Sequence, residues 1–395
     1  MVVENYFDIV IAGGAVMGSA TAFFLANNPD FDGKILVIEK DPSYQTCSTA
    51  LSAASIRQQF STPENIRVSQ FGVDFIKNIG TYLSTGDEPP EVNFVEGGYL
   101  LLASDKGSEV LRSNFAIQQA ENSPLRLLAA AELKDRFPWL NVDDISLGCL
   151  GEQGEGWLDA YGLLQAFRKK AVSLGVSYQK AELVAIGLQG GRVTEVGLAD
   201  GRTVQCGAFV NAAGARAAGV ARMAGLQLPV ESRKRFVFVF RCQDQLGHCP
   251  LVVDPEGIYF RPEGDGFICG MSPAEGEDDP ECFDFDVDYA LFEETIWPRL
   301  AHRVPAFEAI KLSNAWAGHY AYNTFDQNAI LGPHPWLENF YFINGFSGHG
   351  LQQAPAMGRA LAEKIVYGAY RSLDLGCFSF ERLAANRPVK EINVI

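Results

Sequence analysis

The sequence predicts an α/β fold in which a Rossmann-like dinucleotide-binding domain is interleaved with an α+β substrate lobe built on an antiparallel sheet. Two observations carry this prediction. Residues 7–39 read as strand, glycine turn, helix and strand, the βαβ arrangement of a nucleotide-binding domain. Residues 91–139 and 226–312 contain strand patterns without a further βαβ signal. At 395 residues the chain is long enough for two such parts.

The first element is the apolar run FDIVIA, from Phe7 to Ala12, which is typical of a buried parallel strand. The glycine turn GGAVMG, Gly13 to Gly18, follows it directly, and the next ten residues show helical periodicity. The run KILVIEK then predicts a second strand that ends at Glu39. A glycine turn between a strand and a helix, with an acid at the end of the next strand, predicts a dinucleotide site.

Each part of this motif has a physical role. Gly13 permits the tight turn, and Gly18 lets the helix approach the strand closely. The first amides of the helix face a pyrophosphate, and Glu39 accepts hydrogen bonds from ribose hydroxyls. Ala15 departs from the pattern, because it occupies the position of the second glycine.

Composition excludes several classes of protein. The formal net charge of -16 argues against nucleic acid as a partner, since phosphate binding requires clustered Lys and Arg. The eight cysteines contain no C-x-x-C pair, so we expect free thiols and no metal site. The sequence shows no signal peptide and no apolar run of about 20 residues. We therefore expect a cytoplasmic protein without a transmembrane segment, which could still attach to a membrane surface.

The remaining elements follow in order along the chain. A helix capped by Asp159 is expected at Leu158 to Tyr178, and a β-ribbon that returns to the nucleotide-binding domain is expected at 181–214. Near the end, NGFSGHGLQQAPAMG places glycines around Ser347 and His349 just before a helical pattern. Strands of the substrate lobe are expected at Val95 to Ser104, Arg235 to Gln243, Gly257 to Glu263 and Asp265 to Ser272.

Four stretches together resemble the D-amino-acid-oxidase-like superfamily of FAD-dependent amine oxidoreductases, which includes sarcosine oxidase, glycine oxidase and dimethylglycine dehydrogenase. They are GGAVMGSATAFFL with Glu39, the small-residue segment 40–60, VNAAGARA and GFSGHGLQQAPAMGRALAEKI. The resemblance covers essentially the whole chain and implies noncovalently bound FAD. The stretches WAGHYAYNTFDQNAILGPHP, GFSGHGLQQAP and KEINVI are similar to a group within it that is implicated in assembly of respiratory complex I.

The resemblance implies a division of the chain into two interleaved domains. The FAD-binding domain is expected at residues 1–90, 140–225 and 313–395, and the substrate domain at 91–139 and 226–312. The C-terminal glycine elbow is expected to run along the flavin, with a helix that begins near Gln353 to Ala356. The residues expected against FAD are Gly13, Gly14, Ala15, Val16, Met17, Gly18, Glu39, Lys40, Ser48, Thr49, Ser52, Ala53, Val184, Ala212, Ala213, Gly214, Gly318, Gly345, Ser347, Gly348, His349, Gly350, Leu351 and Gln352.

An arginine is the best partner for a substrate carboxylate, because guanidinium offers a planar fork of donors. Arg57 and Arg261 are the candidates, and Arg57 matches the region in which sarcosine oxidase carries a substrate arginine. A salt-bridged structural role stays open for both. Three tyrosines, Tyr259, Tyr320 and Tyr322, could form an aromatic cage for an alkylated amine or could be plain packing residues.

Two histidines complete the set of candidate catalytic residues. His319 falls where monomeric sarcosine oxidase carries its flavin-linking cysteine, so a thioether bond to the flavin is not expected, whereas a covalent link through the histidine stays open. His349 either orders the elbow or transfers protons. Ile268 occupies the position at which sarcosine oxidases place a lysine that promotes the reaction with oxygen. An apolar side chain there predicts a dehydrogenase that reacts slowly with oxygen.

The sequence therefore predicts an FAD-dependent dehydrogenase that oxidises a small-molecule secondary or tertiary amine, such as an N-alkylated amino acid, by hydride transfer to flavin N5. An electron-accepting protein or a quinone would reoxidise the flavin. Two alternatives stay open. One is a flavin-containing assembly or interaction factor for a respiratory complex, and the other is a 2-hydroxy acid dehydrogenase, which would need a base such as His319 or His349.

Overall fold

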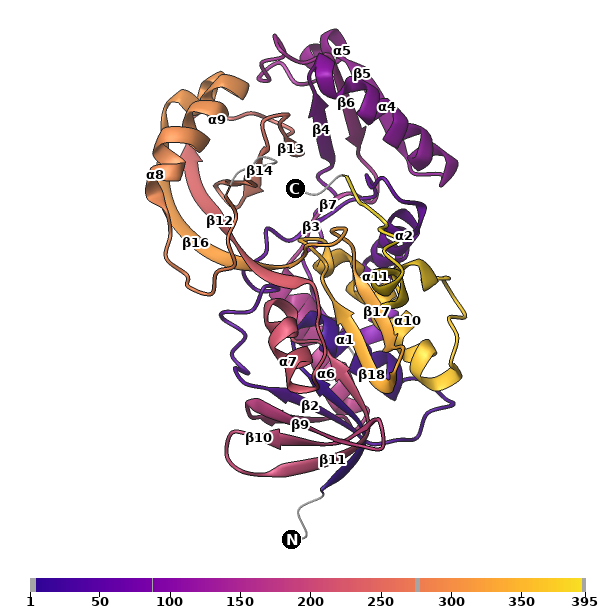
Figure 1. Cartoon of the computed structure of the whole chain (residues 1–395). Coiled ribbons are helices and arrows are strands. Elements are labelled where there is room, and N and C mark those ends of the chain that lie inside the picture. The colour runs from indigo at the N-terminus through magenta and orange to yellow at the C-terminus, as the bar shows by residue number, and fades with distance from the viewer. Residues whose placement is uncertain (1–4, 87, 274–277, 393–395) are drawn as a thin grey trace.

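The computed structural model describes residues 5–86, 88–273 and 278–392. Figure 1 shows two lobes: the lower one holds a sheet with helices packed against it, and the upper one is built on a second sheet. The chain passes between the lobes several times, so each lobe contains segments that are distant in sequence. The predicted α/β fold class is confirmed.

The sheet of the lower lobe has eight strands, with β17, β18, β11, β1, β2 and β8 side by side, β10 paired with β11, and β9 paired with β10. The pairs that involve β1 are parallel, as the βαβ pattern predicts. Its strands are β1 (Tyr6–Ala12), β2 (Ile35–Glu39), β8 (Ser177–Lys180), β9 (Leu183–Gln189), β10 (Arg192–Leu198), β11 (Thr203–Asn211), β17 (Ile330–His334) and β18 (Leu337–Asn344).

Helix α1 is buried because it packs against two other helices, α6 and α10, as well as against the sheet. The contact with α10 is close: a Cβ on Gly358 would lie 2.8 Å from the Cβ of Ala20. The helical segments of this lobe are α1 (Val16–Ala26), α2 (Pro63–Lys77), α3 (Ile79–Leu83), α6 (Ala160–Ser173), η1 (Gly214–Arg216), α7 (Ala217–Met223), α10 (Gly350–Tyr367), η4 (Gly376–Phe378) and α11 (Glu381–Ala384).

The second sheet also has eight strands, in the order β16, β12, β15, β14, β13, β4, β6 and β5. Its pairs are antiparallel except β13 with β4. The strands are β4 (Tyr99–Ala103), β5 (Leu125–Ala129), β6 (Leu147–Gly151), β12 (Val230–Cys242), β13 (Leu251–Val253), β14 (Ile258–Glu263), β15 (Gly266–Met271) and β16 (Ile310–Asn323). The helical segments are α4 (Asp105–Ala120), α5 (Ala130–Arg136), α8 (Tyr289–Leu291), η2 (Phe292–Ile296), α9 (Trp297–Arg303) and η3 (Pro305–Glu308). A small pair, β3 (Ser55–Ile56) and β7 (Gly156–Trp157), stands apart.

Several predicted elements are confirmed, among them β1, α1, β2 and the ribbon from β9 to β11. The Asp159 cap of α6 is also present, since its carboxylate accepts a hydrogen bond from the Gly162 amide. The lobe boundaries differ from the expectation. β6 and β16 belong to the second sheet through their pairing with β4, β5 and β12, and pairing partners are not visible in a local pattern.

Two helix starts also differ. α10 begins at Gly350 rather than near Gln353, because its first turns are buried against α1 and α2, and Pro355 therefore lies inside the helix. α2 has Thr62 as its N-cap, and Ser61 bonds instead to Glu391 near the C-terminus. The resemblance-bearing tail is described only to residue 392, so the end of KEINVI lies outside the described residues.

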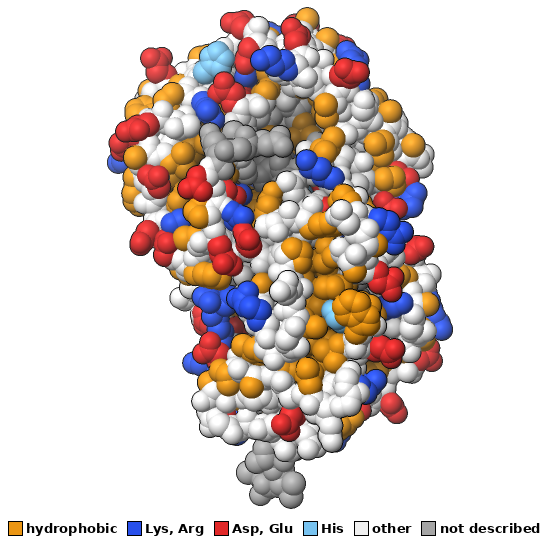
Figure 2. Space-filling view, viewed as in Figure 1, with side chains coloured by type: hydrophobic (Ala, Val, Ile, Leu, Met, Phe, Trp, Pro, Cys, Tyr) orange, Lys and Arg blue, Asp and Glu red, His pale blue; other side chains and the backbone are white. Residues whose placement is uncertain are grey.

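Figure 2 shows charged side chains of both signs spread over one face of the molecule, with hydrophobic side chains gathered over the region of β17 and β18. Trp336, at the turn between these strands, is 75% exposed. Within the described residues, no helix combines the length and the apolar character that crossing a membrane requires. The same residues contain no group of three His, Cys, Asp or Glu side chains placed to hold a metal ion.

Candidate active site

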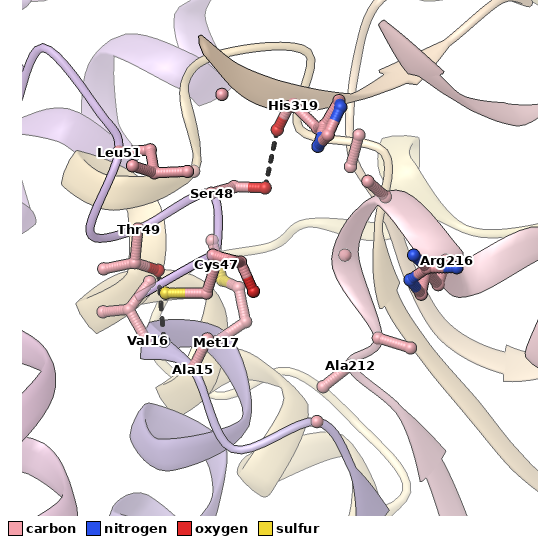
Figure 3. Close-up of a pocket in the computed structure, with 18 of the residues that line it drawn as sticks. Ala15, Val16, Met17, Cys47, Ser48, Thr49, Leu51, Ala212, Arg216 and His319 are labelled. Atoms are coloured by element: carbon pink, nitrogen blue, oxygen red, sulfur yellow. Dashed lines mark hydrogen bonds between the residues drawn. The ribbon is translucent and has the colours of Figure 1, made fainter. Parts of the chain in front are cut away.

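A cavity of about 450 Å³ begins at the carboxyl end of β1 and reaches the second sheet. Figure 3 shows the start of α1 and the segment from Cys47 to Leu51 on one side, with Arg216 and Ala212 across from them. The strands β12, β14 and β16 supply the wall from the upper lobe. The cavity is therefore shared by both lobes, as a site for cofactor and substrate together requires.

The turn after β1 needs glycine at two positions. Gly13 has φ +99°, and a Cβ there would lie 2.4 Å from the carbonyl oxygen of Ala212. A Cβ on Gly18 would lie 1.9 Å from the carbonyl oxygen of Gly13. Ala15, by contrast, has φ -68° and ψ -168°, an extended conformation open to any residue, and it lines the cavity. The absent second glycine is thus compatible with this backbone.

These residues fit a dinucleotide. Ala15 gives α1 no side-chain cap, and the amide of Val16 makes a long hydrogen bond of 3.4 Å to Oγ1 of Thr49. The start of the helix can therefore still bind a ligand in the cavity. Glu39 accepts hydrogen bonds at both carboxylate oxygens, from the amides of Gly14 and Asp41, each at 2.8 Å. Held in this way, Glu39 lines the cavity where ribose hydroxyls would bind.

The C-terminal elbow is a strained turn that packs on Tyr320. Gly345, Ser347 and Gly348 all have positive φ, and a Cβ on Gly348 would lie 2.6 Å from the Tyr320 ring. The Ser347 hydroxyl accepts a hydrogen bond from the Asn323 amide at 3.0 Å, and the Ser347 amide donates to the Ala321 carbonyl at 3.0 Å. The elbow is therefore fastened to β16, and Ser347, Gly348 and Gly350 line the cavity.

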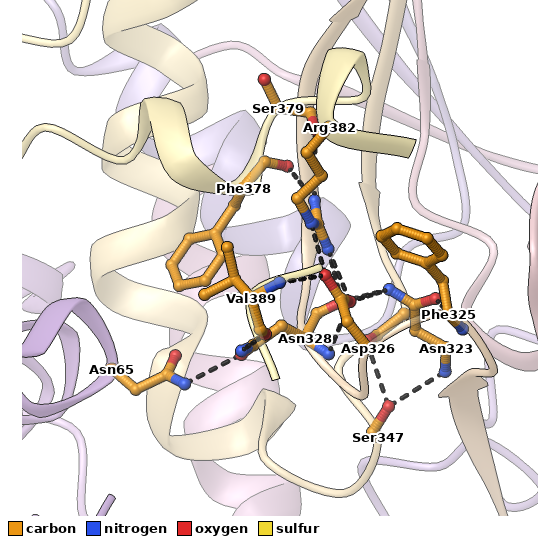
Figure 4. Close-up of polar contacts among 11 residues, drawn as sticks. Asn65, Asn323, Phe325, Asp326, Asn328, Ser347, Phe378, Ser379, Arg382 and Val389 are labelled. Atoms are coloured by element: carbon orange, nitrogen blue, oxygen red, sulfur yellow. Dashed lines mark hydrogen bonds and ion pairs between the residues drawn. The ribbon is translucent and has the colours of Figure 1, made fainter. Parts of the chain in front are cut away.

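A buried polar network supports this elbow from behind (Figure 4). Asp326 accepts a hydrogen bond from the Asn323 side chain at 2.8 Å and forms an ion pair with Arg382 at 2.7 Å. The Asn328 side chain donates to the Val389 carbonyl at 2.6 Å. Through these contacts the C-terminal segment is joined to the turn that carries Ser347.

Arg57 is the candidate substrate arginine that the structure brings into a polar cluster. It is 2% exposed, its guanidinium lies over the rings of Phe60 and Tyr99, and its Nη2 lies 3.2 Å from Nε2 of His349. Tyr320 lies near enough that the charge of Arg57 acts on its pKa. Arg57 and His349 do not line the cofactor cavity within the described residues, whereas Tyr320 does.

Arg261 has a structural environment. Its Nε and Nη2 donate to the carbonyl of Ala53 at 3.1 and 2.9 Å, and its Nη1 bonds to Pro262 and Glu263. Burial lowers the pKa of Arg261, although the contact with Glu263 opposes this change. The guanidinium is used to fix Ala53, and the structure therefore favours Arg57 over Arg261 as the carboxylate partner.

His319 and two phenylalanines form the rim of the cavity. Nε2 of His319 lies 2.8 Å from the carbonyl oxygen of Asp284, so this nitrogen carries the hydrogen. Burial lowers the pKa of His319, which keeps the ring neutral. The main-chain carbonyl of His319 accepts a hydrogen bond from the Ser48 hydroxyl at 2.6 Å. The Phe285 ring packs edge-on against the imidazole, with the ring centroids 4.5 Å apart. His319 is thus a neutral, anchored residue of the wall.

Of the three tyrosines expected to form an aromatic cage, Tyr259 and Tyr320 line the cavity. Tyr322 does not line it, and its hydroxyl accepts a hydrogen bond from Nε2 of Gln327 at 2.6 Å. Burial raises the pKa of Tyr259 and of Tyr320, and that of Tyr259 lies well above its ordinary value. Both hydroxyls therefore remain protonated at neutral pH. A cation held beside them would meet aromatic faces and neutral hydroxyls.

The structure places most of the predicted cofactor residues on the cavity wall. Gly14, Gly18 and Gly345 do not line the cavity, and Gly345 packs against Asn323 and Val230. Gln352 bonds to the Arg57 amide instead. Val184 is exposed, and its neighbour Leu183 lines the cavity instead. Lining residues that were predicted are Gly13, Ala15, Val16, Met17, Glu39, Lys40, Ser48, Thr49, Ser52, Ala53, Ala212, Ala213, Gly214, Gly318, Ser347, Gly348, Gly350 and Leu351.

Sequence reasoning missed several residues of the site. Arg216 lines the cavity and lies over the Phe283 ring at 4.9 Å, and Arg235 lines it beside Tyr320 at 5.3 Å. Phe283 and Phe285 line it from a segment outside any strand. The alternation of phenylalanine and aspartate in CFDFD, residues 282–286, could have drawn attention to Phe283 and Phe285. No local pattern pointed to the two arginines.

Comparison with known proteins agrees with this geometry. Residues 8–364 match the family described as FAD dependent oxidoreductase (DAO). FAD-dependent oxidoreductase domain-containing protein 1 of Xenopus laevis is 42% identical over 423 residues, which cover 98% of this chain and 85% of that protein. Mitochondrial sarcosine dehydrogenase of Mus musculus is 26% identical over 374 residues, 91% of this chain and 40% of that protein.

Among solved structures, L-proline dehydrogenase from P. horikoshii superposes with a TM-score of 0.85 at 25% identity. The match covers 98% of this chain and all of that chain. Fold, nucleotide motif and sequence similarity point to one family. The chain belongs to the DAO family of FAD-dependent oxidoreductases, and FAD is its cofactor.

Proposed function

We propose that the chain is a dehydrogenase that oxidises a secondary or tertiary amine carrying a carboxylate, such as an N-alkylated amino acid, with noncovalently bound FAD. The observation that carries this proposal is the buried guanidinium of Arg57 near Tyr320, which lines the cavity together with Tyr259. A carboxylate bound by Arg57 would place the neighbouring amine near Tyr259 and Tyr320. Bound FAD would supply the acceptor for the hydride that leaves the substrate carbon.

The chain's own residues would then hold and orient the substrate. Arg57 binds the carboxylate, and the aromatic faces of Tyr259 and Tyr320 accommodate the alkylated nitrogen. The burial of Arg57 and Tyr99 keeps water from this end of the site, and Tyr320 faces the cavity. Water would hydrolyse the imine product only after the amine has been oxidised.

Two relatives support both the substrate class and the dehydrogenase reading. Sarcosine and L-proline, the substrates in their names, are secondary amines with a carboxylate, and both names say dehydrogenase. Ile268 also favours this reading, since an apolar side chain cannot stabilise superoxide. Ile268 lies on β15, paired with Arg261 and Val239, and it does not line the cavity. The argument that Ile268 slows the reaction with oxygen therefore rests on the sequence comparison alone. An electron-accepting protein or a quinone is the proposed acceptor.

Anaerobic mixing of the purified yellow protein with sarcosine, dimethylglycine, proline, glycine, D-alanine and 2-hydroxy acids tests the proposal. We expect an N-alkyl amino acid to bleach the flavin absorbance and air to restore it slowly. Rapid recovery in air would indicate an oxidase. No bleaching by any of these compounds, with a flavin that dithionite still reduces, would contradict the proposed activity.

An assembly or interaction role is the second candidate, because Trp336 is exposed at the turn between β17 and β18 and hydrophobic side chains gather over the region of these strands (Figure 2). The cavity shared by both lobes and the buried polar cluster of Arg57 and His349 favour an enzyme. The 2-hydroxy acid reading is weaker. It requires a base, but Nε2 of His349 already faces the guanidinium of Arg57, and Nε2 of His319 is bonded to the Asp284 carbonyl, which leaves Nδ1 of His319 as the candidate.

A further inference from the structure

Glu155 is a fully buried acid that the proposed chemistry does not use. It lies in the loop between β6 and β7, and none of its side chain is exposed. A Cβ on Gly151 would lie 2.1 Å from Oε2 of Glu155, so the carboxyl occupies space that a glycine leaves open. A buried carboxyl is costly unless its oxygens are bonded, so its contacts define its role.

Both oxygens of Glu155 contact the residues that follow Arg57. Oε1 accepts a hydrogen bond from the Gln58 amide at 2.6 Å, and Oε2 accepts from Nε2 of Gln59 at 2.7 Å. Nε2 of Gln59 also donates to the carbonyl of Tyr99 at 3.1 Å. Glu155 therefore joins the segment after Arg57 to the strand that carries Tyr99.

The main chain of Arg57 itself is held from the other side. Its amide donates to Oε1 of Gln352 at 2.7 Å, and its carbonyl accepts from the hydroxyl of Ser69 at 2.5 Å. These contacts come from α10 and α2, whereas the contact of Glu155 comes from the substrate lobe. The backbone that aims Arg57 is thus fixed jointly by both lobes.

We propose that Glu155 is a positioning residue for Arg57: it fixes the main chain at Gln58 and the side chain of Gln59, and thereby aims the guanidinium at the substrate carboxylate. This inference rests on the proposed function, in which Arg57 binds that carboxylate. Only an ionised carboxyl accepts both hydrogen bonds without donating one. A glutamine at this position would direct an amide hydrogen at one of the two donors.

The test is a double-mutant cycle read by ligand binding rather than by turnover. The probes are pyrrole-2-carboxylate, a planar analogue of a secondary amino acid, and its uncharged amide, each titrated against the absorbance of the bound flavin. The variants are Glu155→Gln, Arg57→Met and the double variant. Glu152→Gln is the matched control, because Glu152 is on the same loop but pairs with Arg126 and Arg136 at the surface. Flavin content and thermal unfolding check that each variant folds.

We expect the wild type to prefer the carboxylate over the amide and Glu155→Gln to reduce that preference at least fivefold, with amide binding changed less than twofold. In the Arg57→Met background Glu155→Gln should change nothing further, which a general structural defect would not produce. If Glu155→Gln does not fold, Gln59→Met removes one of the two hydrogen bonds while keeping the charge of Glu155. It should reduce the preference by a smaller factor.

Two results would overturn the inference while leaving the proposed function intact. One is an unchanged or increased carboxylate preference in Glu155→Gln, and the other is an equal loss in the Arg57→Met background. A wild type that shows no carboxylate preference would instead contradict the role of Arg57, and with it the proposed function on which the inference rests.

Discussion

Nη2 of Arg57 lies 3.2 Å from Nε2 of His349 in the buried interior between the lobes. A guanidinium only donates hydrogen bonds, so Nε2 is the acceptor and His349 carries its hydrogen on Nδ1. The imidazole is therefore neutral in this pair. His349 is also the residue before α10, which ties the orientation of Arg57 to the elbow that lines the cavity.

This arrangement predicts how Arg57→Lys behaves. Lysine keeps the charge but loses the planar fork, so we expect a loss of roughly 2–3 kcal/mol in carboxylate binding, about 30- to 150-fold. The effect should appear in KM of an N-methyl amino acid more than in kcat, with flavin content unchanged. Arg261→Lys is the matched control. It should lower the melting temperature and leave KM within about threefold, and an equal KM effect would contradict the assignment to Arg57.

The glycine turn gives a prediction with opposite outcomes at two positions. Gly18→Ala would bring a Cβ to 1.9 Å from the Gly13 carbonyl oxygen, so we expect loss of bound FAD or of the folded protein. Ala15→Gly should change FAD affinity by less than about threefold, because φ at Ala15 suits any residue. Flavin content and quenching of flavin fluorescence on adding FAD to apoprotein measure both. A tenfold gain in affinity for Ala15→Gly would show that the methyl group obstructs the cofactor.

Glu391 predicts a stability effect far from the cavity. Its Oε1 accepts from the amide and the hydroxyl of Ser61 at 2.8 and 2.5 Å, and its Oε2 accepts from Thr62 and Asn65 at 3.0 Å each. These donors lie at the N-terminus of α2, where a negative charge is favourable.

Glu391→Gln should therefore lower the free energy of unfolding by about 1–3 kcal/mol, since one donor would face an amide group. Denaturant unfolding followed by circular dichroism measures the change. Lys390→Gln, at the neighbouring exposed position, should alter the same quantity by less than about 0.5 kcal/mol. Equal effects of the two substitutions would contradict a capping role for Glu391.

Glu155 predicts a pH dependence of stability. Burial raises its pKa from 4.5 to about 7, although hydrogen bonds from Gln58 and Gln59 and the charge of Arg57 oppose the rise. The carboxyl also interacts with the titratable groups of Tyr99 and Cys149. Between pH 4.5 and about 7, Glu155 therefore holds a proton in the folded state that it has lost in the unfolded state. The free energy of unfolding should therefore fall as pH rises toward 7 and level off above it.

The expected fall is about 2 kcal/mol between pH 5.5 and 7. Glu155→Gln cannot titrate and should lose this component, which is measured as the difference from wild type in denaturant unfolding at several pH values. Glu152→Gln should retain the pH-dependent component of stability. Desolvation raises the pKa of Glu152, but Arg126 and Arg136 outweigh this effect and lower it, so Glu152 does not titrate between pH 5.5 and 7. Parallel wild-type and Glu155→Gln curves would contradict the assignment.

The sequence by itself determined the nucleotide-binding half of this protein. One local unit contains the strand, Gly13, Gly18 and Glu39. Their spacing therefore reveals the turn, the helix start and the acidic residue expected to bind the ribose hydroxyls. The same holds for the elbow around Ser347, where glycines in sequence mark a turn that only positive φ allows.

Tertiary structure alone decided the substrate half. Arg57 and Arg261 are both candidates in the sequence, and their surroundings separate them: Arg261 meets the Ala53 carbonyl, whereas Arg57 meets a histidine 292 residues away. Glu155 gave no signal, because its role depends on Gln58 and Gln59 being brought beside it across the lobes. A local pattern records the geometry of neighbours in the chain. The donors that set the charge and direction of a buried group come from segments that only folding brings together.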